Sequence, residues 1–444
     1  MVQNAPGAAD HPHKGGIALK LHWFAEASYP DLPPDFRASG ESSWVTTPIS
    51  RCEPAVVGEM TRMFIRLMQQ ADREGFDGLA MNEHHQTPFA LTPSPNLLAA
   101  TLANTTQNAA LLIIGDSLAL YNPPVRVAEE VAWLDCLSEG RVISGFVFGT
   151  PMDTLYCYGV SPTELRERFH EARELIQKAW ESTEPFAFNG KYTKLRYVNL
   201  WPRPVQKRPP IWVPGSGSVE TWDLALKNDY CYGQLSFSGL HSAKPLVDAW
   251  WDHAARSGYD TNPFQLAFTQ LICCAETDAE AEAKYSEAVK YFYRNRSVHP
   301  GFETGPGFRT QKSVQAMARF AEETAKNLPP EEKARANAGE MDFWDYDKHG
   351  FIIAGSPDRV RQRIEEMVKE LRVGQLIACL HMGNLDEETA AMNTHLMATR
   401  VHPHLRSLWS EHEDRWTPPS VKAAHAAALA KTAAQPLKLA GARA

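Results

Sequence analysis

The feature that most constrains the fold is a regular alternation of short apolar runs with helix-type segments. Eight runs have the length and the β-branched or aromatic content of buried strands: residues 17–24, 78–82, 109–120, 142–148, 210–213, 232–237, 265–275 and 374–381. Segments with apolar residues at helical spacing, such as 57–74 and 124–137, lie between them. Strands that alternate with helices form parallel βαβ units, and eight such units close into a ring. The sequence therefore predicts an α/β fold, a (β/α)8 TIM barrel.

Three stretches depart from this rhythm. Residues 1–16 form a polar segment that we expect to be a flexible leader, and residues 409–444 form a C-terminal tail that is rich in Ala and Lys toward its end. Residues 294–350 combine a Gly/Pro-rich part with a charged part. We expect them to be an insertion before the last helix–strand unit, which could close as a lid over a barrel that spans residues 17–408.

Composition excludes several classes of protein. The 444 residues carry 45 Lys and Arg against 53 Asp and Glu, a formal net charge of −8, which disfavours a nucleic-acid partner. The sequence has no apolar run of about 18 residues and no signal-peptide core near its start, which predicts a cytoplasmic protein without a membrane span. The seven cysteines are odd in number and irregularly spaced, so we expect free thiols.

A polar cluster, MNEHHQ at residues 81–86, directly follows the second predicted strand. Barrel active sites lie at the carboxyl ends of the strands, and an imidazole can exchange a proton near neutral pH. Alternation of side chains along a strand would allow only one of His84 and His85 to face inward. This predicts one catalytic histidine with a separately placed Glu83 and no metal site; a hydrogen-bonded structural pair of histidines is the alternative.

A second candidate site follows the fifth predicted strand, where Gly215, Ser216, Gly217 and Ser218 precede a helix. Backbone N–H groups at a helix start, together with serine hydroxyls, can bind a phosphate, and late loops of barrels often do so. Arg166, on the helix after the fourth predicted strand, could add a positive charge. The alternatives are an ordinary Gly-Ser loop and a solvated helix charge.

Taken in order, several segments resemble the bacterial-luciferase-like family of flavin-dependent monooxygenases, over residues 16–408. The matching segments are MNEHHQTPF at 81–89, NPPVRVAEEVAWLDCLSEGRVISGFVFG at 122–149, ELRERFHEARELIQKAW at 164–180, PRPVQKRPPIWVPGSGS at 202–218 and GSPDRVRQRIEEMV at 355–368. The resemblance implies a (β/α)8 barrel that uses reduced flavin mononucleotide (FMN) supplied by a separate flavin reductase.

The resemblance also implies roles for individual residues. His84 matches the family's catalytic histidine, with Glu83 beside it near the flavin. The loop 215–218 and Arg166 match the phosphate-binding residues. Those expected to border the flavin ring are Ser117 and Leu118, on a segment that often has a cis peptide in the family, with Val147 and Thr150. Phe148 departs from the pattern, because luciferase itself has a phosphate-contacting arginine there.

The function implied is that of a two-component monooxygenase. Reduced FMN and O2 would oxygenate an apolar organic small molecule through a flavin hydroperoxide, with the reductase as a transient partner and the protein as a homodimer. Aromatic residues that could line the substrate pocket, with core packing as the alternative role, are Trp23, Phe24, Phe89, Tyr121 and Trp212.

Three other functions remain compatible with the sequence. A deazaflavin- or flavin-dependent dehydrogenase or reductase of the same superfamily would transfer hydride without O2. A metal-dependent barrel hydrolase would need several strand-end ligands, for which the sequence offers His84, His85 and His381. A flavin-binding protein without catalysis is the third.

Overall fold

The computed structural model describes residues 19–33, 42–235, 237–296, 298, 300–303 and 307–424. The expected leader, residues 1–16, and the end of the expected tail, residues 425–444, lie outside the described residues. Among the described helices, none combines the length and the apolar character that crossing a membrane requires.

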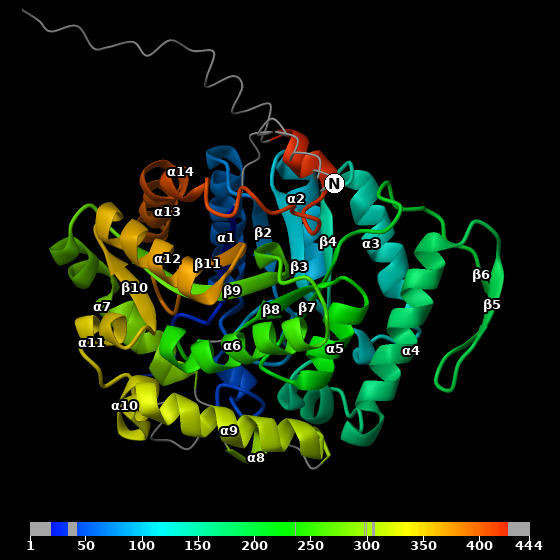
Figure 1. Ribbon diagram of the computed structural model, residues 1–444, viewed down its shortest axis with the longest axis horizontal. Coiled ribbons are helices and arrows are strands. Elements are labelled where there is room, and N and C mark those ends of the chain that lie inside the picture. Colours follow the sequence, from blue (N-terminus) through cyan, green and yellow to red (C-terminus); the bar gives the residue numbers. More distant parts are fainter. Residues whose placement is uncertain are drawn as a thin grey trace, which may run out of the picture.

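Eight parallel strands form a closed barrel, as the sequence predicted (Figure 1). Each strand pairs with the next, β11 pairs with β1, and β9 pairs with β8, so the ring has no free edge. The strands of the ring are β1 (Lys20–Ala25), β2 (Gly78–Met81), β3 (Ala110–Ser117), β4 (Val142–Val147), β7 (Ile211–Gly215), β8 (Cys231–Gln234), β9 (Leu266–Cys274) and β11 (Gln375–His381).

Helices follow the strands and cover the outside of the barrel (Figure 1). Helix α1 shows why they form: its residues Met60, Phe64, Leu67, Met68 and Ala71 make one buried stripe at helical spacing. The covering helices are α1 (Pro54–Glu74), α2 (Pro95–Thr105), α3 (Val125–Leu137), α4 (Pro162–Glu181), α5 (Val219–Lys227), α6 (Leu240–Arg256), α7 (Asp278–Asn295), α12 (Pro357–Leu371), α13 (Glu387–Leu396) and α14 (His402–Leu405).

One strand was not predicted. β10 (Ile352–Gly355) pairs with residues 271–274 of β9, beyond the point where β8 ends against residue 268. Leu271 pairs with β11 on its other side. β10 therefore pairs with the edge of β9 that lies beyond the end of β8. Four residues beside a charged segment carry too little periodicity to identify a strand, which is why sequence analysis missed it.

The insertion forms helices that lie across one end of the barrel (Figure 1). These are α8 (Pro300–Glu303), α9 (Gln311–Asn327), α10 (Pro330–Ala338) and α11 (Phe343–Lys348). Helix α9 is attached to α5 and α6, since Phe320 packs against Trp222 at 6.1 Å between ring centroids and the Thr324 hydroxyl donates to the Ser242 carbonyl. The insertion therefore forms part of the wall around the barrel mouth.

Two smaller features complete the fold. The expected hairpin around Asn189-Gly190 is present as β5 (Phe186–Asn189) and β6 (Lys194–Val198), outside the barrel. Residues 409–424, which were expected to belong to a tail, pack against the barrel instead. Trp416 and Val421 are buried, and the Trp416 indole N–H donates to the Asp229 carbonyl.

Candidate functional site

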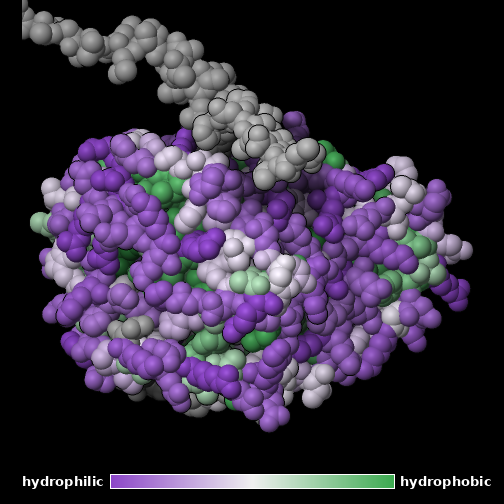
Figure 2. All heavy atoms as spheres, viewed as in Figure 1, coloured by the Kyte–Doolittle hydropathy of each residue, from purple (hydrophilic) through white to green (hydrophobic). Residues whose placement is uncertain are grey.

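A cavity of about 420 Å³ lies at the carboxyl ends of the strands, where barrel active sites are found. One part of its wall is apolar, with Phe24, Ile114, Val147, Leu235 and Phe237. A cluster of hydrogen-bonding and ionisable groups consists of Glu26, Asn82, Glu83, His84 and Asp153. Hydroxyls and cationic groups come from Arg166, Ser216, Ser218, Arg309 and Ser313. Seen from the viewpoint of Figure 2, polar side chains cover most of the outer surface.

His84 lies in this cavity, but for a different reason from the one expected. Strand β2 ends at Met81, so residues 82–85 form a loop and strand alternation does not orient the two histidines. The loop places the His84 ring against Trp44, with 4.7 Å between ring centroids, whereas His85 is buried and does not line the cavity. The prediction that one histidine of the pair faces inward is confirmed, and its argument from alternation is wrong.

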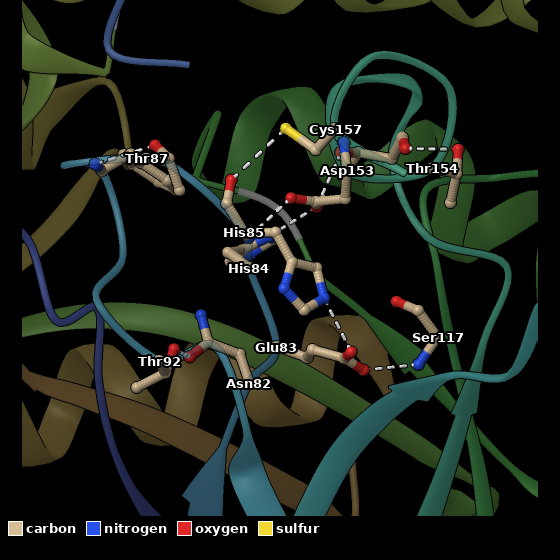
Figure 3. Close-up of polar contacts among 12 residues, drawn as sticks. Asn82, Glu83, His84, His85, Thr87, Thr92, Ser117, Asp153, Thr154 and Cys157 are labelled. Atoms are coloured by element: carbon tan, nitrogen blue, oxygen red, sulfur yellow. Dashed lines mark hydrogen bonds and ion pairs between the residues drawn. The ribbon is translucent and has the colours of Figure 1, made fainter. Parts of the chain in front are cut away.

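Asp153 holds both histidines in place (Figure 3). Its Oδ2 atom lies 3.0 Å from Nδ1 of His84, and its Oδ1 atom accepts the backbone N–H of His85 at 2.8 Å. The Thr150 hydroxyl also donates to Oδ2, at 2.9 Å. Because a carboxylate only accepts hydrogen bonds, Nδ1 of His84 carries a proton. Among the described residues, Nε2 of His84 has no partner, so it is the ring atom left for a ligand.

A π-helical segment, Met152–Cys157, carries Asp153 to this position. Gly149 precedes it in the left-handed region, with φ of 80°, and a β-carbon there would lie 2.5 Å from the Thr154 side chain. Such π-helical turns are rare and often occur at functional sites. Sequence analysis missed Asp153, since nothing in its local pattern marks it as a partner of a residue 69 positions earlier.

The charges around His84 favour its protonated form. Burial alone would lower the pKa of the imidazole, but the charge of Asp153, its hydrogen bond, and the carboxylates of Glu26 and Glu83 raise the pKa above the ordinary value. The surroundings therefore shift the pair of His84 and buried Asp153 toward its imidazolium–carboxylate form.

Glu83 positions its neighbours (Figure 3). Its Oε1 atom lies 2.8 Å from Nε2 of His85, and its Oε2 atom accepts the backbone N–H of Ser117 at 2.6 Å. The hydroxyl of Tyr158 lies 3.2 Å from the other nitrogen of His85. This network fixes the end of β3 relative to the loop after β2. His85 therefore has the structural, hydrogen-bonded role that the sequence left open as the alternative.

Glu26 is a second ionisable group that sequence analysis missed. It follows β1 directly, its side chain lines the cavity, and it is only 1% exposed. Asn82 donates a hydrogen bond to its Oε1 atom. Burial raises the pKa of Glu26 to about 7, although the charge of His84, the Asn82 hydrogen bond and the charge of Arg296 favour the ionised form. Its position after a predicted strand was the signal available in the sequence.

The Gly-Ser loop lies at the cavity, but part of its donor set is used within the protein. The Gly217 N–H donates to the Tyr232 hydroxyl at 3.1 Å, and the Ser218 hydroxyl donates to Glu220 at 2.8 Å. Partial burial opposes ionisation of Glu220, but hydrogen bonds from Thr310, Ser313 and Ser218 lower its pKa to about 2. Glu220 thus attaches the insertion to the start of α5.

Three arginines line the cavity, Arg296 just after α7 and two others near this loop. The Arg166 guanidinium lies over the Phe148 ring, 5.1 Å from its centroid, and Phe148 stacks on Phe169 at 3.9 Å. Phe148 therefore provides an aromatic support for Arg166. The second arginine, Arg309, comes from the insertion and was not expected. The described residues thus bring two guanidinium groups to this part of the cavity.

The remaining predicted residues divide into two groups. Those that line the cavity are Phe24, Ser117, Val147, Thr150, Gly215 and Ser216. Those that do not are Trp23, Phe89, Leu118, Tyr121, Trp212 and Gly217. Trp23 and Trp212 are fully buried, because Trp23 packs outward and donates to Thr394 of α13, whereas Trp212 contacts the ring of His22, on the non-adjacent strand β1, inside the barrel. The cis peptides among the described residues precede Pro123 and Pro202, so the expected one at 117–118 is absent.

These residues fit a phosphorylated aromatic cofactor. Apolar walls suit a planar ring system, while two guanidinium groups and serine hydroxyls suit a phosphate. Because Glu220 accepts the Ser218 hydroxyl, fewer hydrogen-bond donors of the loop are available for a phosphate. The phosphate contacts would then come mainly from Arg166, Arg309 and Ser216. Within the described part of the chain, no three His, Cys, Asp or Glu side chains gather as a metal ion would require.

A comparison of the sequence with models of known protein families identifies the family of this chain. The model of the family described as luciferase-like monooxygenase matches residues 42–374, three quarters of the chain. The chain belongs to the luciferase-like monooxygenase family. The match includes the loop after β2, the π-helical segment, the Gly-Ser loop and the insertion, so all parts of the cavity except β1 and Glu26 lie within it.

The proteins that resemble this chain in sequence or in fold differ in the cofactor that they are described with. The oxygenase component of the flavin-dependent trigonelline monooxygenase of Acinetobacter baylyi is 31% identical over 240 residues, 52% of this chain and 63% of that protein. A solved structure of the Pseudomonas putida 3,6-diketocamphane monooxygenase in complex with FMN covers 87% of this chain and 98% of its own, with 21% identity and a TM-score of 0.64. The structure of a coenzyme F420-dependent tetrahydromethanopterin reductase from Methanopyrus kandleri covers 87% of this chain and 99% of its own, with 18% identity and a TM-score of 0.56.

The pair of His84 and Asp153 predicts the effect of Asp153→Asn. Loss of the carboxylate charge removes the group that raises the pKa of His84, so the pKa of His84 falls in the variant, as NMR titration of the imidazole signals would measure. Because the folded-state pKa of His84 is raised, the pair stabilises the fold below the unfolded value of about 6.5, and this stabilisation is lost as the pH rises through the folded pKa.

The free energy of unfolding of the wild type should therefore exceed that of Asp153→Asn by more at about pH 6 than at about pH 9. Asp223→Asn is the matched control, because Asp223 pairs with His253 on the surface at 2.8 Å. It should leave the titration of His84 unchanged. An unchanged His84 titration in Asp153→Asn would contradict the assignment.

Proposed function

We propose that the protein is the oxygenase component of a two-component monooxygenase. It would take reduced FMN from a separate flavin reductase and use O2 to oxygenate an apolar organic small molecule. The observation that carries the proposal is the cavity itself, which combines apolar walls, three guanidinium groups and the pair of His84 and Asp153. Family membership and the oxygenase-component relative support the same reading.

Binding of the cofactor would depend on two sets of residues. Arg166, Arg309 and Ser216 would hold the phosphate through charge-assisted hydrogen bonds. The apolar side chains of Ile114 and Val147, at the ends of β3 and β4, would flank the ring. When bound, reduced FMN supplies the electrons that reduce O2.

Exclusion of water would depend on the insertion. Phe308 and Met317 line the cavity from this segment, and Glu220 attaches it to α5 through Thr310 and Ser313. A closed apolar wall limits the access of water to a reactive centre and strengthens electrostatic interactions inside. The insertion would therefore serve as the lid that the sequence suggested.

Proton management would fall to His84. Asp153 orients the ring and stabilises its charged form, which favours a second proton at Nε2, the atom without a partner among the described residues. A positioned acid of this kind can protonate an oxygen atom of a bound reactant. Glu83 and His85 would act indirectly, by holding the loop and the end of β3 in place.

A second candidate function is hydride transfer with a deazaflavin cofactor, favoured by the fold shared with the F420-dependent reductase. The expected homodimer is also a proposal. It draws support from α3, which leaves Trp133 and Leu137 exposed, at 55% and 39%.

Oxygen uptake distinguishes the two candidates. The protein mixed anaerobically with photoreduced FMN and then with O2 should alter the rate of flavin reoxidation relative to free reduced FMN, and a panel of apolar substrates should include one that is consumed. Reduced F420 should support no such reaction with O2. Reoxidation identical to that of free FMN, together with substrate turnover on F420, would establish the deazaflavin function instead.

Arg166→Ala should weaken FMN binding by about tenfold to a hundredfold, since a charge-assisted phosphate contact contributes about 1.5–3 kcal/mol. The maximal rate at saturating flavin should change little, because the phosphate is remote from the reacting ring. Arg168→Ala is the control on the same helix, where Arg168 pairs with Glu164 and does not line the cavity. Equal flavin affinity in the two variants, measured by fluorescence titration, would show that Arg166 does not contribute to flavin binding.

His84→Ala should keep the fold but lower coupled product formation, with more reducing equivalents lost as hydrogen peroxide. A general acid contributes roughly a hundredfold to ten-thousandfold, so the defect should appear in turnover. His85→Ala should lower the melting temperature more, because His85 is buried between Glu83 and Tyr158. Full coupled activity in His84→Ala would exclude the proposed role.

A further inference from the structure

Glu26 is a buried carboxyl group inside the cavity for which the proposed function has no role. It lies at the carboxyl end of β1, on the side of the ring formed by β11, β1 and β2. Its one hydrogen-bond partner among the described residues is Asn82, and it forms no ion pair with them. A carboxylate that is 1% exposed and lacks an ion pair is costly, so the group keeps its proton more readily than a surface glutamate does.

The charged and titratable groups that face Glu26 come from four elements. They are His84 on the loop after β2, Asp153 on the π-helical segment, Arg296 just after α7 and Cys379 on β11. His84 and Arg296 favour the carboxylate, while Asp153 favours the neutral acid. Burial outweighs them and raises the pKa of Glu26 to about 7. Glu26 can therefore both hold and release a proton near neutral pH, whereas the Asp153 charge makes His84 hold its proton more firmly.

We propose that Glu26 is a second proton donor of the cavity, which delivers a proton to oxygen as O2 is reduced there. The inference rests on the proposed function, since it requires reduced flavin and O2. In the reaction without substrate, O2 takes up two electrons and two protons, all supplied overall by reduced FMN, and leaves as hydrogen peroxide. The O–H bond of the Glu26 carboxyl breaks and an O–H bond to oxygen forms.

The carboxylate that remains is stabilised by the Asn82 amide and by the charges of His84 and Arg296. It recovers a proton released as the flavin is oxidised, so the protein gains and loses no proton over a cycle. When a substrate is oxygenated, one oxygen atom of O2 enters the product and the other leaves as water. The Glu26 carboxyl then donates its proton to the oxygen atom that leaves as water.

Glu26→Gln tests the inference with little change in shape, because the Gln side-chain oxygen can still accept the Asn82 hydrogen bond. The probe is photoreduced FMN mixed with O2 in a stopped-flow instrument, without substrate. We expect hydrogen peroxide release from the wild type to slow as the pH rises through about 7. In Glu26→Gln it should be roughly a hundredfold slower at about pH 6 and should no longer depend on pH over this range.

Asp116→Asn is the matched control. Asp116 is also a fully buried carboxyl whose pKa is raised, first by burial and then by Glu83, but it hydrogen-bonds to Asn96 and Tyr121 and does not line the cavity. Its variant should retain the pH dependence of the wild type. The same loss of pH dependence in both variants would show that any buried carboxyl produces the effect, and would overturn the inference.

A second measurement does not depend on bound flavin. Infrared spectra of the ligand-free wild type should contain the C=O band of a protonated carboxylic acid that titrates at about pH 7. The band should be absent in Glu26→Gln and shifted in Glu26→Asp, which keeps the test available if one variant fails to fold. Absence of that band from the wild type at about pH 6 would overturn the inference.

The two proposals fail in different ways. If the wild type reoxidises reduced FMN exactly as buffer does, the proposed function is wrong and the role of Glu26 falls with it. If the wild type alters reoxidation but Glu26→Gln has the same rate and pH dependence, only the role of Glu26 is wrong.

Discussion

Closure of the barrel by the parallel pairing of β11 with β1 is the constraint on which the site depends. It brings the carboxyl ends of strands that are up to about 350 residues apart in sequence to one rim, as the register of His22 with Ile377 shows. The loop after β2, the π-helical segment after β4, the Gly-Ser loop after β7 and the residue after β1 all meet at that rim. Without closure, none of these short segments would form a cavity.

Electrostatics inside the cavity follow from burial. Asp153, Glu26 and Glu83 are all buried near His84, and Glu83 also lies 2.8 Å from the ring of His85. Ionisation of all three with a neutral histidine would be costly in a medium of low polarity. The structure resolves this by raising the pKa of His84 and that of Glu26, which leaves two groups that can hold protons in one small volume.

The insertion contributes to the site as well as covering it. Arg309, Ser313 and Met317 line the cavity, and Glu220 is hydrogen-bonded to Thr310 and Ser313 of the same segment. Glu220 stands in the first turn of α5, where the positive end of the helix favours a carboxylate. In the proposed function, a phosphate at this loop would lie close to that carboxylate, and the cationic groups from α4 and from the insertion would offset its charge.

Sequence alone determined the barrel and the place of the loop that carries His84, because both depend on local periodicity. Apolar runs of strand length alternate with helical stripes, and the EHH motif follows a strand, so His84 could be placed at the rim without knowledge of its neighbours. Only the tertiary structure decided which groups surround His84. Asp153, Glu26 and Arg309 are brought to the cavity from distant positions by strand closure, a π-helical turn and the docking of the insertion, and no local pattern marks Asp153 or Arg309. The loop conformation of residues 82–85 likewise depends on Asp153, which accepts the His85 N–H, and so strand alternation could not predict it.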